Sequence, residues 1–159
     1  MVETRVWVDV MKVLVVYDSV HGNTEIIAKA IAGAVEGDVN LVRAVDVSPA
    51  TLQGVDLIIA GAPTHGGQAT PEMQQFLAGL KEDDVRGKKA ASFDTRLSAK
   101  WVTIFGYAAG RIGKKLKDMG AELLVNPEPF FVTATKGPLK DGEEARAIAW
   151  VKNIMSKNG

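Results

Sequence analysis

The chain has 159 residues, of which 47% are hydrophobic and 24% charged, a composition typical of one globular domain. Lysine and arginine balance aspartate and glutamate at 19 each, so the charge gives no reason to expect nucleic-acid binding. The absence of cysteine excludes disulfides, iron–sulfur ligation and thiol chemistry, and two separated histidines predict no metal site. Any redox chemistry must therefore come from a bound cofactor.

The chain shows no sign of a membrane segment. No apolar run approaches the ~18 residues that a membrane helix needs. The first ten residues carry Glu3 and Asp9 and lack the sustained apolar core of a signal peptide. We therefore expect a cytoplasmic protein that has no membrane partner.

Residues 1–11 are predicted to be an N-terminal extension, and residues 12–159 to form the domain. Val6, Val8 and Val10 share one face, as they would in an additional edge strand. A disordered extension fits the same residues, with Met11 as an alternative start. Both interpretations stay open at the level of sequence.

Short runs of β-branched and other apolar residues alternate with helical patterns along the domain. Because strictly alternating units of this length form parallel sheets with right-handed crossovers, we expect one α/β domain with five parallel strands and helices on both faces. The strands are predicted at residues 12–17, 39–45, 56–61, 89–93 and within 122–132, where Pro127 and Pro129 interrupt the pattern.

The predicted helices have recognisable starts and packing faces. Thr70 is a predicted N-cap, followed by Pro71 in the first turn. Asp141 and Glu144 have the spacing of a capping box before the last helix. The third long helix is expected at residues 104–119, where we interpret three glycines as sites of close helix–sheet packing: Gly106, Gly110 and Gly113.

The loop after the first strand predicts a phosphate site. The start of a helix offers unpaired N–H groups and about half a positive charge, which stabilise an anion without a basic side chain. Ser19, Asn23 and Thr24 add short polar side chains, and Gly22 lets the backbone bend closely around a ligand. The same residues would also serve simply to cap a helix. The chain lacks the GxGxxG fingerprint of dinucleotide-binding folds and the GxxxxGK[ST] motif of P-loop proteins. It also has Ala62–Pro63 at the end of the third strand, where a receiver domain carries its phosphorylated aspartate.

The Ser-x-x-Gly-Asn-Thr pattern after a hydrophobic strand resembles the phosphate loop of flavodoxins, and the resemblance extends over roughly residues 12–155. It implies a three-layer sandwich with strand order 2-1-3-4-5 and FMN as the cofactor. Carried over residue by residue, it makes the loop the phosphate ligand, with His21 contributing mainly its backbone. The implied phosphate-binding residues are Ser19, Val20, His21, Gly22, Asn23 and Thr24.

A second predicted cofactor loop follows the third strand and contains Pro63, Thr64, His65, Gly66 and Gly67. Adjacent glycines suit a backbone that passes close to a flat ligand, although a simple glycine turn with an exposed histidine gives the same pattern. The resemblance implies that His65 stands where many flavodoxins carry an aromatic residue against the flavin. It also implies that Gly66 or Gly67 hydrogen-bonds the ring nitrogen that is protonated in the semiquinone.

The third predicted loop follows the fourth strand and contains Phe93, Asp94, Thr95 and Arg96. Its backbone is expected to bind the pyrimidine edge of the flavin, and Arg96 either adds positive charge there or lies on the surface. Trp101 falls where short-chain flavodoxins carry a stacking aromatic residue. A tryptophan that packs in the core is the alternative.

The resemblance implies an electron carrier whose FMN cycles between quinone, semiquinone and hydroquinone. The alternative is an FMN-dependent NAD(P)H:quinone reductase, and a third possibility is an interaction module without a cofactor. Expected partners are a redox protein or a small quinone and NAD(P)H, and the chain is expected to be a monomer or a small homo-oligomer. No catalytic side chain is predicted, and His65 is a weak candidate for acid–base chemistry.

Overall fold

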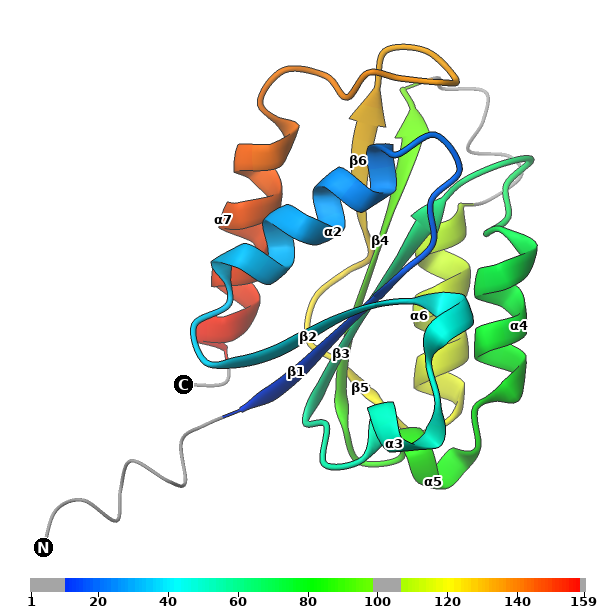
Figure 1. Cartoon of the computed structure of the whole chain (residues 1–159), viewed down its shortest axis with the longest axis vertical. Coiled ribbons are helices and arrows are strands. Elements are labelled where there is room, and N and C mark those ends of the chain that lie inside the picture. Colours follow the sequence, from blue (N-terminus) through cyan, green and yellow to red (C-terminus); the bar gives the residue numbers. More distant parts are fainter. Residues whose placement is uncertain (1–10, 99–106, 158–159) are drawn as a thin grey trace, which may run out of the picture.

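The computed structural model describes residues 11–98 and 107–157, which form a three-layer α/β sandwich (Figure 1). The expectations for residues 1–10, for Gly106 and for Trp101 therefore lie outside the described residues. Met11 packs, partly buried, against the core. The elements in chain order are β1 (Lys12–Tyr17), α2 (Asn23–Ala34), β2 (Asp38–Arg43), η1 (Ala44–Asp46), α3 (Pro49–Leu52), β3 (Leu57–Pro63), α4 (Pro71–Gly79), α5 (Glu82–Val85), β4 (Lys89–Leu97), α6 (Ala108–Asp118), β5 (Glu122–Leu123), β6 (Glu128–Val132) and α7 (Glu143–Ser156).

The sheet has the predicted strand order, β2-β1-β3-β4-β5, and β6 also pairs with β4. All of these pairs are parallel. Two short strands occupy the predicted fifth position. β5 pairs with the start of β4 at Lys89 and Ala90, and β6 pairs with its last five residues. Pro127 lies between the two, and because proline has no N–H to donate, it favours this break in the ladder.

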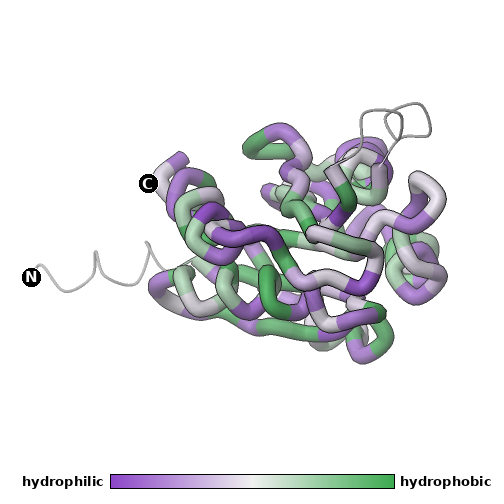
Figure 2. The backbone as a smooth tube through the Cα atoms, turned by 90° about the horizontal axis from the view of Figure 1, so that it is seen from above, coloured by the Kyte–Doolittle hydropathy of each residue, from purple (hydrophilic) through white to green (hydrophobic). Residues whose placement is uncertain are grey.

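Alternate side chains of β1 and β3 enter two separate cores. Leu14 and Val16 face α4 and α6, whereas Val13 and Val15 face α2 and α7 (Figure 1). Viewed from above, the helices carry alternating hydrophilic and hydrophobic stretches, as expected of helices that bury one side (Figure 2). Each fully buried aliphatic side chain contributes about 1.5–3 kcal/mol relative to exposure, so both layers of helices are held firmly against the sheet.

The packing of α6 agrees with one glycine prediction and contradicts another. A Cβ at Gly113 would lie 2.8 Å from the Ser92 Oγ, so glycine is needed there for close contact with β4. Gly110 has nothing within 4 Å of such a Cβ, and the prediction of close packing is wrong for this residue because it lies on the exposed side of the helix. Among the described helices, none is long and apolar enough to cross a membrane.

The start of α7 also differs from the prediction. No side chain caps this helix, whose N-cap is Gly142, so the predicted capping box of Asp141 and Glu144 is wrong. Glu143 instead accepts hydrogen bonds from the Phe131 N–H at 2.7 Å and from the Arg146 Nε at 2.9 Å. Arg146 also contacts Glu128 and the Pro129 carbonyl, so this cluster ties α7 to β6.

The ion pair between Glu143 and Arg146 gives a pH-dependent contribution to stability. Hydrogen bonding to Arg146 is the main cause that holds the pKa of Glu143 below its ordinary value of 4.5. A carboxyl whose pKa is lower in the folded state adds stability above its unfolded pKa and loses it as the pH falls through the folded pKa. We expect Glu143→Gln to cost the most stability near neutral pH, with the difference from wild type shrinking below about pH 4.5 in chemical denaturation. A difference that stays constant down to pH 2 would contradict this account.

Candidate functional site

A cavity of about 690 Å³ is lined by the loops after β1 and β3, by the last residues of β4 and by the end of β6 with the loop that follows it, at the carboxyl ends of the strands. This is the edge at which parallel α/β sheets bind ligands, next to the switch in strand order. Most of the residues predicted to bind a cofactor line it. They are Ser19, Val20, His21, Asn23, Thr24, Pro63, Thr64, His65, Gly66, Gly67, Thr95 and Arg96.

The loop before α2 leaves backbone donors unpaired beside this cavity. The N-cap is Gly22, whose φ of 94° is accessible to glycine at little cost, and its N–H bonds the Ser19 Oγ at 3.0 Å. The Ser19 Oγ also receives the Glu25 N–H at 3.4 Å. In the part of the chain that the structure describes, the N–H groups of Asn23 and Thr24 have no acceptor. The site therefore offers free donors at the positive end of a helix.

Hydrogen bonds to other segments hold this loop in place. Thr24 is 1% exposed, and its hydroxyl lies 2.7 Å from the hydroxyl of Thr95 at the end of β4. The Asn23 Nδ2 donates to the Lys136 carbonyl at 3.2 Å, in the loop after β6. The first loop is thus fixed to two other segments before any ligand binds.

Arg43 is a further support of the first loop that sequence reasoning missed. Its Nη2 donates to the Ser19 carbonyl at 2.6 Å, and its Nε to the Asp18 carboxylate at 3.3 Å. The parallel register pairs Arg43 with Tyr17, which places its side chain beside the loop. No local pattern gives this position, because it depends on how β2 aligns with β1.

The loop after β3 forms a tight two-residue turn. His65 and Gln68 exchange backbone hydrogen bonds at 2.9 and 3.0 Å. The two central residues, Gly66 and Gly67, have φ values of 58° and 80°, a combination that favours glycine at both positions. Arg111 of α6 donates from Nε to the Gly67 carbonyl at 2.7 Å and anchors the turn. The glycines are therefore required by the turn itself, whatever it contacts.

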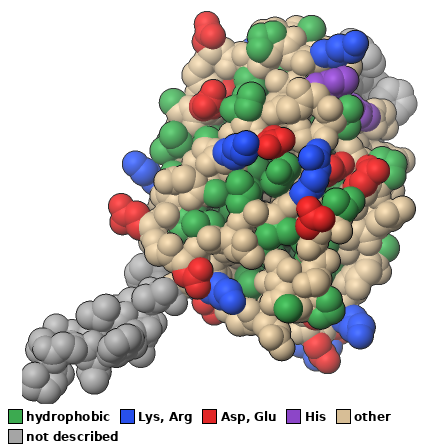
Figure 3. All heavy atoms as spheres, in the orientation of Figure 1, with side chains coloured by type: hydrophobic (Ala, Val, Ile, Leu, Met, Phe, Trp, Pro, Cys, Tyr) green, Lys and Arg blue, Asp and Glu red, His purple; other side chains and the backbone are tan. Residues whose placement is uncertain are grey.

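Both histidines of the chain lie on the wall of this cavity. The rings of His21 and His65 have centroids 6.4 Å apart, and the two side chains lie close together near the upper end of the molecule (Figure 3). They come from two different loops, both of which were predicted to bind the cofactor. Among the described residues, no group of three or more potential metal ligands is present.

The end of β4 divides its residues between the two faces of the sheet. Phe93 packs in the core against Phe130 and Trp150, with ring centroids 6.1 and 6.0 Å away. Phe93 and Asp94 are both fully buried and do not line the cavity, in contrast to Thr95 and Arg96. The physical reason is that β4 extends to Leu97, so Phe93 and Asp94 lie within the sheet, and the last residues of the strand are the ones that reach its carboxyl edge.

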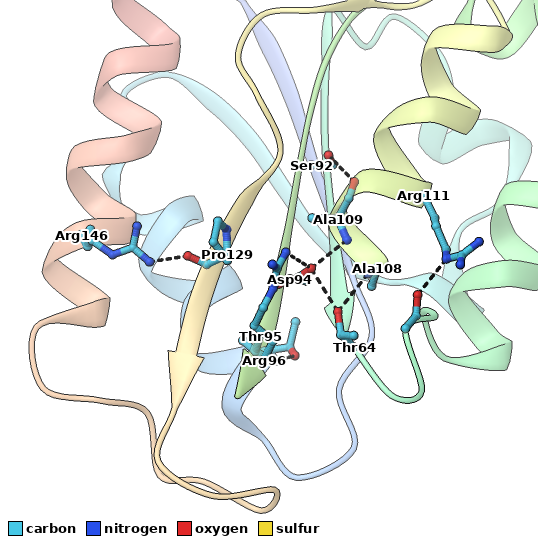
Figure 4. Close-up of polar contacts among 12 residues, drawn as sticks. Thr64, Ser92, Asp94, Thr95, Arg96, Ala108, Ala109, Arg111, Pro129 and Arg146 are labelled. Carbon is cyan, nitrogen blue, oxygen red and sulfur yellow. Dashed lines mark hydrogen bonds and ion pairs between the residues drawn. The ribbon is translucent and has the colours of Figure 1, made fainter. Parts of the chain in front are cut away.

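The buried Asp94 carboxylate joins three parts of the site (Figure 4). Its Oδ2 accepts from the Thr64 hydroxyl at 3.0 Å and from the Ala109 N–H at 2.9 Å, at the start of α6. Arg96 donates two further bonds, from Nε at 2.8 Å and from Nη2 at 2.7 Å. The Thr64 Oγ1 in turn accepts the Ala108 N–H at 2.9 Å. Asp94 therefore accepts a backbone hydrogen bond from the first turn of α6 and positions the guanidinium of Arg96.

A fourth segment contributes wall residues that were not predicted. Leu97, Val132 and Thr135 line the cavity, and the last two come from the end of β6 and the loop that follows. Gly22 belongs to the first loop without lining the cavity, and Trp101 lies outside the described residues. The fourth segment could have been predicted from the carboxyl end of the fifth strand, since the loops that follow the strands of a parallel sheet lie at the same edge.

The cavity combines free amides, hydroxyls, apolar side chains and one guanidinium. Among the described residues that line it, there is no carboxylate. This arrangement suits a ligand with an anionic end and a flat, largely apolar body. Fold and site together define a cofactor-binding α/β protein.

The comparisons with known proteins give the family. The family model described as "Flavodoxin domain" matches residues 14–121. A flavodoxin from Maridesulfovibrio salexigens is 36% identical over 120 residues, which cover 71% of this chain and 81% of that protein. A flavodoxin structure from the domain Archaea has a TM-score of 0.77 at 25% identity, covering 93% of this chain and 99% of that one. For oxidised flavodoxin 1 from Bacillus cereus the TM-score is 0.74 at 25% identity, with coverage of 91% and 97%.

The chain belongs to the flavodoxin family, whose members are electron-transfer flavoproteins that bind FMN. The residues present fit this cofactor. The amides of Asn23 and Thr24 are donors that lack acceptors among the described residues, as a phosphate requires. The glycine turn leaves backbone, without side chains, along the cavity wall.

Thr24 offers a direct test of the first loop. We expect Thr24→Val to weaken FMN binding about tenfold, because one hydrogen bond to a charged group contributes about 1.5–3 kcal/mol. A larger side chain, as in Thr24→Leu, should abolish binding. Titration of the apoprotein with FMN, followed by quenching of flavin fluorescence, measures both.

Thr133→Val is the matched control, because this exposed threonine bonds the Pro138 carbonyl near the cavity without lining it. Its affinity for FMN should equal that of wild type. Unchanged affinity in Thr24→Leu would remove Thr24 from the site.

Proposed function

We propose that this chain binds the FMN phosphate with the loop of residues 19–24 and works as a one-electron carrier between redox proteins. The observation that carries the proposal is the pair of free N–H groups at the start of α2, on Asn23 and Thr24. A phosphate is the anion that such a helix start binds without basic side chains. The buried hydroxyl of Thr24 adds a donor at the same position when Thr95 donates the hydrogen bond between the two threonines.

The rest of the cavity is proposed to hold the flavin ring. The turn of Gly66 and Gly67 forms one wall, with His65 beside it, and Thr95 and Arg96 form another. Val20 and Leu97 are 54% and 40% exposed, and they give the cavity an apolar surface that suits the body of a flavin. Bound FMN supplies a group that accepts and donates single electrons. The protein's part is to hold it at the edge of the sheet, where a partner can approach.

The cavity favours a carrier over an enzyme. Among the described residues, the side chains on its wall that could serve as a general acid or base are those of His21 and His65. Within the described part of the chain, no hydrogen bond orients either ring, whereas acid–base catalysis requires an oriented base. We therefore expect electron transfer without proton-transfer chemistry by the protein.

The visible spectrum and a turnover assay test this proposal. Purified protein, or apoprotein incubated with FMN, should show the absorbance of a bound flavin. Once reduced chemically, it should pass electrons to a one-electron acceptor protein such as a cytochrome. With NADPH and a quinone it should show no more turnover than free FMN at the same concentration. Rapid NADPH oxidation would favour a reductase, and protein that stays colourless with FMN would contradict both functions.

A further inference from the structure

The Arg96 guanidinium occupies an unusual position in the cavity. Its side chain is 13% exposed and lines the wall, whereas its partner Asp94 is fully buried behind it. The two bonds to Asp94 use Nε and Nη2 (Figure 4). The guanidinium also lies over the Tyr107 ring, with Cζ 3.3 Å from the centroid. Arg96 is thus held on one side by a carboxylate and on another by an aromatic face.

The orientation of this pair makes the cavity electrically asymmetric. The positive member lines the wall and the negative member does not, so an occupant meets the positive end of the dipole first. Among the described wall residues no carboxylate opposes it. Charges act strongly at short range in a partly buried site, because water screens them less there.

We propose that the pair of Arg96 and Asp94 sets the relative affinity of the cavity for the reduced and oxidised cofactor, with Arg96 favouring the reduced form. Reduction adds negative charge to the occupant wherever protons do not follow the electrons. A fixed positive charge on the wall stabilises that form more than the oxidised one, and the buried Asp94 partly offsets this effect. The inference rests on the proposed binding of FMN.

The rigidity of the pair is what makes this effect specific to Arg96. Asp94 is held by Thr64 and by the Ala109 N–H of α6, so the carboxylate cannot follow its partner toward the cavity. The Tyr107 ring restricts movement of the Arg96 guanidinium from the other side. Asp94 is therefore a positioning residue, which acts through Arg96 and through its own compensating charge.

Two substitutions that remove charges of opposite sign give the decisive experiment. Arg96→Gln removes the positive charge and should weaken binding of reduced FMN relative to oxidised FMN about tenfold, which makes a one-electron potential ~59 mV more negative. Asp94→Asn removes the compensating negative charge and should shift the potential in the opposite direction. Both potentials are measured by redox titration, together with the dissociation constants of oxidised FMN. Damage to structure alone would not give shifts of opposite sign.

Arg43→Gln is the matched control. Arg43 also pairs with a buried aspartate, Asp18, but it supports the first loop and does not line the cavity. Its loss should change the affinity for both redox forms equally and leave the potentials in place. Arg96→Lys keeps the charge and should shift the potential less than Arg96→Gln. This comparison decides the question if Asp94→Asn does not fold.

The outcomes separate this inference from the function on which it rests. Wild-type protein that fails to bind FMN overturns both. Wild-type protein that binds FMN normally, with potentials that are unchanged or shifted in the same direction in both variants, overturns the role of Arg96 alone. Opposite shifts, with Arg43→Gln unchanged in potential, support it.

Discussion

The structure depends on keeping two backbone N–H groups free at the start of one helix. Those of Asn23 and Thr24 find no acceptor in the described chain, a condition that costs free energy unless a ligand or water satisfies them. Several contacts hold the loop in this state. Gly22 adopts a left-handed conformation, Arg43 holds the Ser19 carbonyl, and Thr24 is bonded to Thr95. A preformed anion site loses less entropy when its ligand binds.

The sheet brings the other walls to this point and a buried carboxylate keeps them together. Parallel strands deliver their carboxyl ends to one edge, so the loops after β1 and β3, the end of β4 and the end of β6 meet there (Figure 1). Asp94 then links Thr64, Arg96 and the first turn of α6 by hydrogen bonds of 2.7–3.0 Å (Figure 4). The cavity is thus shaped by backbone topology, and the buried Asp94 holds its β3, β4 and α6 side together.

Sequence patterns predicted the features that depend on residues close together in the chain. They did not predict the positions of side chains that are determined by tertiary contacts. The alternation of strands and helices predicted the parallel sheet, the resemblance to flavodoxins implied its strand order, and the polar, glycine-containing loops after the first and third strands marked the cavity. The end of β4 was predicted to be a loop, whereas the strand continues to Leu97 and buries the side chains of Phe93 and Asp94. Arg43 depends on strand register, and Glu143 took the place of a predicted cap through a contact with β6. None of these has a local signature.

Phosphate binding at the start of α2 is the proposal on which the other assignments depend. The most direct test compares the affinity of the apoprotein for FMN and for riboflavin, which has the same ring system and no phosphate. If the free amides and Thr24 bind that group, riboflavin should bind at least ~100-fold more weakly, since two or more charge-assisted hydrogen bonds are lost. Equal affinities would contradict the account.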